Sequence, residues 1–204
     1  MFDKFKSFIS PNEESSLLDN IKNLKDLINL VATKSIFSIL DNQNKSNKLK
    51  FVGGCVRKLL NKEMVNDIDI ATSLTPSELK NILIEKKVFF TEVGIVYGTI
   101  TVVINKIRFE ITSLRKDVST DGRHANVEFI SDWETDAKRR DFTINAIYSD
   151  LKGEIYDPLG GQKDLENKIV KFIGDPNKRI KEDYLRILRY FRFYTQYSNN
   201  QHDI

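Results

Sequence analysis

Residues 51–72, with the sequence FVGGCVRKLLNKEMVNDIDIAT, decide the fold of this chain. The apolar run Leu49–Val52 predicts a strand that enters the pair Gly53–Gly54, and Val56–Leu60 predicts a helix directly after it. Glycines at such a turn allow backbone N–H groups to approach a phosphate closely, and a helix N-terminus attracts anions. The turn is a candidate phosphate site with Arg57 in reach of the same anion, although a Gly-Gly pair before a helix is more often only a tight turn.

Two carboxylates follow on the next predicted strand, Val65–Ala71. Alternate side chains of a strand share a face, so Asp67 and Asp69 point together while the isoleucines beside them enter the core. The two acids repel each other unless a cation neutralises them, and Mg²⁺ suits such hard oxygen ligands. Glu110, on the second strand of a predicted hairpin, is placed to complete a two-metal cluster. The alternatives are solvated acids on an exposed strand and a pairing of Glu110 with a lysine.

Two arginine-rich segments lie further along the chain, Lys138–Ala146 (KRRDFTINA) and Glu182–Arg192 (EDYLRILRYFR). One side of the helix predicted for the second segment carries Asp183, Arg186, Arg189 and Arg192. Arginine presents a planar fork that suits phosphates and base edges, so such a face can bind a nucleotide. Taken alone, each segment is better explained as a solvated helix face or a ladder of ion pairs.

The composition limits the class of protein. The chain has 204 residues, 40% hydrophobic and 30% charged, with a net charge of +3, and this length suffices to bury a core without disulfides. The single cysteine, Cys55, excludes an internal disulfide and indicates a reducing compartment. No apolar run approaches the ~20 residues that span a bilayer, and the N-terminus does not resemble a signal peptide. We therefore expect a soluble, cytoplasmic protein without a membrane partner.

The remaining pattern predicts a small sheet with hairpin pairs and flanking helices. Helices are expected over residues 17–41, 76–86, 136–146, 163–167 and 176–197, and further strands over 99–104, 107–112, 147–149, 154–156 and 169–172. Pattern alone leaves the classes α/β and α+β open. The expected division is an N-terminal helical segment (1–47), a sheet-bearing domain (48–155) and a helical segment (156–204).

Five segments together resemble the class II tRNA nucleotidyltransferase and poly(A) polymerase family, which includes the CCA-adding enzymes. They are GGCVRKLLNKEMVNDIDIATSLTP, EITSLRKDVSTDGRHANVEF, KRRDFTINAIYSD, YDPLGGQKDLENKIVKFIG and KRIKEDYLRILRYFRF, which follow the family order over residues 53–193. The resemblance implies a catalytic head domain with the polymerase-β-type nucleotidyltransferase fold, followed by a helical neck. It is closest to the CCA-adding branch of mitochondria and related bacteria. Lys58 departs from the pattern, because the family usually has Asp there.

The resemblance also implies roles for single residues. Asp67 and Asp69 match the metal-binding carboxylates, and Glu110 matches the third carboxylate of the active site. The positions that match nucleotide-binding residues are Gly53, Gly54, Arg57, Arg140, Asp183, Arg186, Arg189 and Arg192. Within this set, Asp183 and Arg186 match the pair that selects CTP and ATP by their Watson–Crick edges. The segment 117–128 resembles the flexible loop that the family needs for the switch to ATP.

The activity that the resemblance implies is the addition of CCA to tRNA 3′ ends from CTP and ATP. The chemistry is a two-metal, Mg²⁺-dependent nucleotidyl transfer that releases pyrophosphate. Poly(A) polymerase is one alternative, and a fragment that binds nucleotide without turnover is another. The family's body and tail domains, which hold tRNA, lie beyond the matched segments, so a second chain that supplies them is an expected partner.

Overall fold

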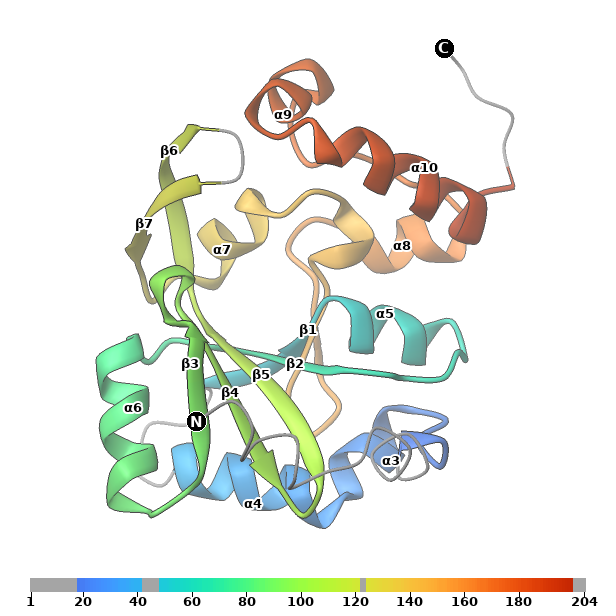
Figure 1. Cartoon of the computed structure of the whole chain (residues 1–204). Coiled ribbons are helices and arrows are strands. Elements are labelled where there is room, and N and C mark those ends of the chain that lie inside the picture. The colour runs from blue at the N-terminus through green and yellow to red at the C-terminus, as the bar shows by residue number, and fades with distance from the viewer. Residues whose placement is uncertain (1–17, 42–47, 122–123, 200–204) are drawn as a thin grey trace.

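The computed structural model describes residues 18–41, 48–121 and 124–199 (Figure 1). Its centre is a seven-stranded mixed sheet with the strand order β3-β4-β5-β2-β1-β8-β9. The strands are β1 (Leu49–Val52), β2 (Ile68–Thr72), β3 (Phe90–Gly94), β4 (Thr99–Ile104), β5 (Ile107–Ser113), β8 (Tyr148–Ser149) and β9 (Ile155–Tyr156). A separate pair, β6 (Arg115–Asp121) and β7 (His124–Phe129), forms a two-stranded sheet. The predicted mixed α/β fold is confirmed.

Strand β2 shows why the central sheet has one apolar and one polar face. Its residues Ile68 and Ile70 are buried beside Phe109 of the parallel strand β5. Asp69 lies between the two isoleucines and therefore points to the opposite face. The parallel register sets Asp69 directly beside Glu110. The pattern of β2 thus buries the isoleucines and places two acids next to each other on adjacent strands.

The apolar face of the sheet is covered by helices from the N-terminal half (Figure 1). They are α3 (Leu24–Asn29), α4 (Val31–Leu40) and α6 (Pro76–Glu85), and α5 (Gly54–Leu60) follows β1 directly. Leu27, Phe37 and Leu83 are buried in one cluster with the sheet. Helix α6 begins with a capping box, in which the Thr75 hydroxyl accepts from the Glu78 N–H and the Glu78 carboxylate accepts from the Thr75 N–H.

The C-terminal helices lie on the other side of the sheet (Figure 1). They are α7 (Trp133–Arg139), α8 (Gly161–Glu166), α9 (Pro176–Glu182) and α10 (Leu185–Tyr197), with a 3₁₀ turn η2 (Thr143–Asn145) before β8. Aromatic packing fixes α10, because the ring of Phe142 lies 5.5 Å from Phe193 and 4.7 Å from Phe172. Phe172 in turn stacks on Tyr190 at 5.6 Å. Within the described ranges, every helix is too short or too polar to traverse a bilayer.

The helix predicted over 136–146 is wrong beyond its first turn. It ends before Arg140, whose backbone is extended, and η2 follows. The side chain of Asp141 explains the break, because it accepts hydrogen bonds from the Phe142 N–H and from Nδ2 of Asn145, each at 2.9 Å. Aspartate often competes in this way with the helical backbone bonds.

The single helix predicted over 176–197 is also wrong, since α9 and α10 are separated at Asp183. The Asp183 backbone is extended, and its carboxylate accepts the Leu185 N–H at 3.0 Å. The strand predicted over 169–172 is reduced to one isolated bridge between Phe172 and Phe142. Both differences arise from contacts between segments that a local pattern does not contain.

Three strands have no counterpart among the predicted elements. Strand β3 is an edge strand without a clear alternation, and its pairing with β4 is irregular between Thr91 and Gly94. Strands β6 and β7 occupy the segment that resembles the family's flexible loop, and they pair antiparallel from Arg115 and Phe129 onward. The described part of this loop is thus a β-ribbon.

Helix α6 ends in a Schellman motif whose left-handed position is held by Lys87, with φ 54°. The N–H of Val88 donates to the Leu83 carbonyl, and the N–H of Lys87 donates to the Ile84 carbonyl. Side chains disfavour this conformation, so Lys87→Gly is expected to raise the free energy of unfolding by about 0.5–1 kcal/mol. Urea unfolding followed by circular dichroism measures the change.

The neighbouring Lys86 is the matched control, because its φ is −82° and its ψ is 3°. At this position glycine adds only unfolded-state entropy, and Lys86→Gly is expected to lower stability by about 0.5–1 kcal/mol. Equal destabilisation by the two substitutions contradicts the assignment of strain to Lys87.

Candidate active site

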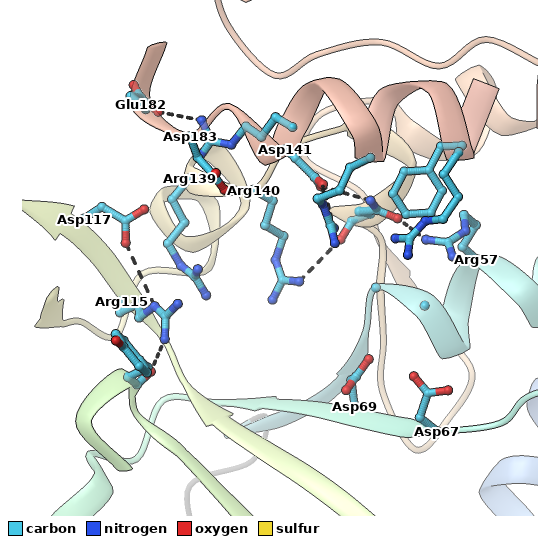
Figure 2. Close-up of a pocket in the computed structure, with 18 residues that line it drawn as sticks. Arg57, Asp67, Asp69, Arg115, Asp117, Arg139, Arg140, Asp141, Glu182 and Asp183 are labelled. Atoms are coloured by element: carbon cyan, nitrogen blue, oxygen red, sulfur yellow. Dashed lines mark hydrogen bonds and ion pairs between the residues drawn. The ribbon is translucent and has the colours of Figure 1, made fainter. Parts of the chain in front are cut away.

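A cavity of about 560 Å³ lies between β2 with the β1–α5 turn on one side and α9–α10 on the other (Figure 2). The predicted site residues that line it are Gly53, Gly54, Arg57, Asp67, Asp69, Arg140, Asp183, Arg186, Arg189 and Arg192. Figure 2 shows the two aspartates across the cavity from Asp183, with Arg139 and Arg140 between them. The fold therefore brings the glycine turn, the paired acids and both arginine-rich segments to one place.

The cavity has an acidic wall formed by Asp67 and Asp69, and a basic wall formed by Arg57, Arg140 and the arginines of α10. The glycine turn lies between the two walls. Gly53 has a φ of 69°, which side chains rarely adopt, and a Cβ there would lie 3.5 Å from Nη1 of Arg140. A Cβ on Gly54 would lie 3.8 Å from Oδ2 of Asp69. The missing side chains thus leave the backbone close to a guanidinium on one side and to a carboxylate on the other.

The two aspartates have different surroundings. Asp67 is exposed and directly precedes β2, while Asp69 is half-buried within the strand. Burial, together with the charges of Asp67 and Glu110, raises the pKa of Asp69 to about 6, although Arg140 and Arg57 act in the opposite direction. A divalent cation relieves this repulsion, so the oxygen donors of Asp67 and Asp69 fit Mg²⁺.

A third protein ligand is not assembled beside this pair. Among the described residues, no three His, Cys, Asp or Glu side chains are grouped so that they could hold a metal ion. Glu110 is exposed, does not line the cavity, and acts on Asp69 through its charge from the adjacent strand. The arrangement of two carboxylates suits Mg²⁺, which commonly binds one or two carboxylates and completes its shell with waters and substrate phosphates. The role of Glu110 as third carboxylate stays a prediction.

Arg140 is held in a fixed orientation by groups behind it. Its guanidinium donates to the buried carboxylate of Asp136 at 3.1 Å and to Oη of Tyr148 at 3.2 Å. Tyr148 itself donates to Asp136 at 2.8 Å. Burial opposes the charge, but Tyr148 and Asp136 outweigh it and raise the pKa of Arg140 above its usual value. A permanent positive charge therefore faces the acids across the cavity.

Two arginines of α10 are fixed by carboxylates as well. Arg189 donates to Oδ2 of Asp141 from two nitrogens, at 2.7 and 2.6 Å. Arg186 donates to Glu182 and to the Arg179 carbonyl, each at 2.7 Å. These contacts restrict the rotamers of two long side chains, so that their donors are positioned before a ligand arrives.

Several residues of the cavity were missed by the sequence reasoning. They are Tyr97, Arg115, Asp117, Arg139, Asp141, Asn145, Glu182 and Phe193. The spacing of Asp141 and Asn145 carried a signal, because two short polar residues four apart within a basic segment can bond to each other. Arg115 had none in its local pattern, and it is recognisable from its surroundings, since burial and Arg139 lower its pKa to about 10.

Cys55 lies next to the site but does not belong to its chemistry. The thiol is buried and donates to the Val52 carbonyl at 3.3 Å. Burial, with the charge of Asp69, raises its pKa to about 12. A protonated, enclosed thiol is neither a nucleophile nor a metal ligand.

The raised pKa of Asp69 has a consequence for stability. Since the folded state disfavours its ionised form, Asp69→Asn is expected to stabilise the metal-free protein at pH 7.5 by on the order of 1–2 kcal/mol. The gain is full above the folded pKa of about 6 and vanishes towards the unfolded pKa near pH ~4. Thermal unfolding in EDTA at pH 7.5 and pH 4.5 measures it.

Asp67→Asn is the matched control, because Asp67 is exposed and loses little hydration on folding. Its substitution is expected to change stability by less than about 0.5 kcal/mol. A loss of stability in Asp69→Asn at pH 7.5 contradicts the repulsion described above.

The sequence and the fold of this chain are similar to those of proteins of known activity. Residues 49–171 match the sequence model of the family described as "Poly A polymerase head domain". The human mitochondrial CCA tRNA nucleotidyltransferase 1 is 42% identical over 186 residues, which is 91% of this chain and 40% of that protein. The CCA-adding enzyme of Staphylococcus epidermidis is 42% identical over 76% of this chain and 38% of its own length. The chain thus spans about 40% of the length of such relatives.

Solved structures agree with the sequence relatives. The crystal structure of Bacillus stearothermophilus CCA-adding enzyme in complex with CTP has a TM-score of 0.68 and 35% identity, over 80% of this chain and 39% of that one. A tRNA nucleotidyltransferase complexed with a primer tRNA and an incoming ATP analogue has a TM-score of 0.57 and 30% identity, over 71% of this chain and 40% of that one. The chain belongs to the family of the poly(A) polymerase head domain, which it shares with the CCA-adding nucleotidyltransferases.

Proposed function

We propose that this chain adds CCA to the 3′ end of tRNA from CTP and ATP, with release of pyrophosphate. The observation that carries the proposal is the cavity, in which paired carboxylates face arginines from α7 and α10. Relatives named CCA tRNA nucleotidyltransferase and CCA-adding enzyme support it. Similar structures that hold CTP, or a primer tRNA with an ATP analogue, support the substrates.

Asp67 and Asp69, on the acidic wall of the cavity, are the residues proposed to hold Mg²⁺. When bound, Mg²⁺ neutralises the pyrophosphate leaving group and favours the ionised form of the primer 3′-hydroxyl. Both aspartates must be ionised for this. The negative charge of Glu110 on β5 lies beside Asp69 and increases the attraction of this wall for cations.

The basic wall is proposed to hold the triphosphate. Arg57 and Arg140 line the cavity near the glycine turn, and guanidinium groups form strong charge-assisted hydrogen bonds with phosphate oxygens. With the triphosphate held by both walls, its α-phosphorus is open to in-line attack by the 3′-hydroxyl. The new bond forms between that oxygen and the α-phosphorus, while the bond to the bridging oxygen of the pyrophosphate breaks.

Selection of the base is proposed to lie with Asp183 and Arg186, assisted by Arg189 and Arg192. Cytosine and adenine each present an amino donor beside a ring nitrogen that accepts, whereas uracil and guanine present a carbonyl beside an N–H. A carboxylate accepts from the amino group and a guanidinium donates to the ring nitrogen, so one aspartate and one arginine favour C and A over U and G. The fixed orientation of Arg186 supports this role.

The activity is tested with labelled CTP or ATP and a tRNA that lacks its CCA end. We expect CMP incorporation without ATP, and AMP incorporation only after CMP has been added. Asp69→Asn is expected to lower incorporation at least about a hundredfold, since it removes a carboxylate from the proposed metal site. Glu92→Gln is the control, because Glu92 pairs with Lys80 outside the cavity.

The same assay separates the remaining alternatives. Incorporation of AMP without CMP identifies a poly(A) polymerase. The assay is repeated with cell extract added, because a partner chain that supplies a tRNA-holding surface is a candidate requirement. Binding of ATP without incorporation, both alone and with extract, identifies a nucleotide-binding fragment and contradicts the proposal.

Base selection is tested by Asp183→Asn. Asparagine keeps an oxygen for the Leu185 N–H but adds an amide donor that suits the carbonyl of uracil. The preference for CTP over UTP, measured as a ratio of kcat/KM, is expected to fall about tenfold or more.

Asp175→Asn is the matched control, because Asp175 accepts the Lys178 N–H at the start of α9 and does not line the cavity. It is expected to leave the ratio unchanged. A ratio that is the same in Asp183→Asn as in the wild type removes Asp183 from base selection.

A further inference from the structure

The guanidinium of Arg57 is packed against helix α10. The binding of a phosphate does not by itself require this contact. Arg57 is only 6% exposed, and two rings of α10 enclose it. Its central carbon lies 4.7 Å from the centroid of Phe193 and 4.9 Å from that of Tyr197. A cation over an aromatic face is attracted by the ring quadrupole, more strongly where water is excluded.

The two rings are themselves anchored. Phe193 is 4% exposed and meets Phe142 edge-on at 5.5 Å. Tyr197 is 6% exposed and donates from its hydroxyl to Glu63 at 2.9 Å, in the segment that follows α5. The position of the rings is therefore set by the head domain, and not only by α10.

The nitrogen atoms of the Arg57 guanidinium differ in their hydrogen bonding. One terminal nitrogen donates to Oδ1 of Asn145, whereas Nε is buried and has no hydrogen-bond partner. Arg57 also lines the cavity beside the glycine turn, so an anion bound there meets its guanidinium.

We propose that Phe193 and Tyr197 are positioning residues that clamp Arg57 so that its guanidinium is ready for the nucleotide triphosphate. The inference rests on the proposed function and deepens it. An exposed arginine samples many rotamers and loses that freedom when it binds a phosphate. The clamp removes this freedom beforehand and makes the phosphate grip depend on the docking of α10 against the head.

The clamp is proposed to act on the triphosphate through Arg57, so a substitution that acts only there affects ATP, CTP and a ligand without a base equally. Tyr197 tests this most directly, because the ring of Phe193 also lies 5.5 Å from the guanidinium carbon of Arg189 and 4.7 Å from that of Arg192. The probes are Mg²⁺-ATP, Mg²⁺-CTP and tripolyphosphate, titrated calorimetrically into the full chain. Phe193→Leu and Tyr197→Leu are each expected to weaken all three about three- to tenfold, and Tyr197→Leu is expected to do so with an unchanged ratio of ATP to CTP affinity. Tyr197→Phe keeps the ring but loses the hydroxyl that anchors it to Glu63, so it is expected to weaken binding less than Tyr197→Leu does.

Phe191→Leu is the matched control on the same helix, because Phe191 is half-exposed and does not line the cavity. It is expected to bind all three probes like the wild type. Circular dichroism and thermal unfolding show which variants are folded at the titration temperature. If Phe193→Leu is unfolded there, Tyr197→Leu at the end of α10 decides alone.

A double-mutant cycle with Arg57→Gln separates positioning from general packing. If the rings act through Arg57, their substitution has no further effect on tripolyphosphate affinity in the Arg57→Gln background. An equal loss in both backgrounds, or no loss in the wild-type background, overturns the clamp. A wild-type chain that binds neither ATP nor tripolyphosphate contradicts the proposed function instead.

Discussion

The buried carboxylate of Asp141 joins the parts of this structure that make the site. One oxygen accepts from Phe142 and Asn145, which breaks the helix that the local pattern predicts, and the other accepts from Arg189 of α10. Burial opposes its charge, but Arg189 and the hydrogen bond from Asn145 outweigh that effect and keep its pKa below the usual range. Asn145 in turn accepts from Arg57. One charge thus connects α5, the 3₁₀ turn and α10.

The cavity has negative charges on one wall and positive charges on the other, and the two sets are too far apart to form ion pairs with each other. Burial and the charges of Asp67 and Glu110 raise the pKa of Asp69, while Arg140 and Arg189 opposite are paired with carboxylates behind them. Such a cavity is complementary to a ligand that carries a cation at one end and phosphates at the other. A magnesium nucleotide has this distribution of charge, which is why the two walls are best explained together.

The sequence predicted those parts of the fold and site that depend on local periodicity. The alternation in β2, the capping box of α6 and the glycine turn were all visible, because each is encoded within a few residues. The ends of α7 and α9 were not, since a carboxylate bonded to the backbone overrides helix propensity there. The enclosure of Arg57 was also out of reach, because its partners Phe193 and Tyr197 belong to a pattern that reads equally well as an ordinary apolar helix face.

The single cysteine, Cys55, is a natural probe of motion in the floor of the cavity. Its thiol donates to the carbonyls of Val52 on β1 and Asp69 on β2, so it is enclosed where these two strands meet. An alkylating reagent reaches this sulfur only when β1, α5 and β2 move apart. The rate of alkylation therefore reports local opening of the floor of the cavity, in the native chain and without an introduced label. A ligand that ties the two strands together slows that rate by a factor that rises exponentially with the free energy with which it holds them closed.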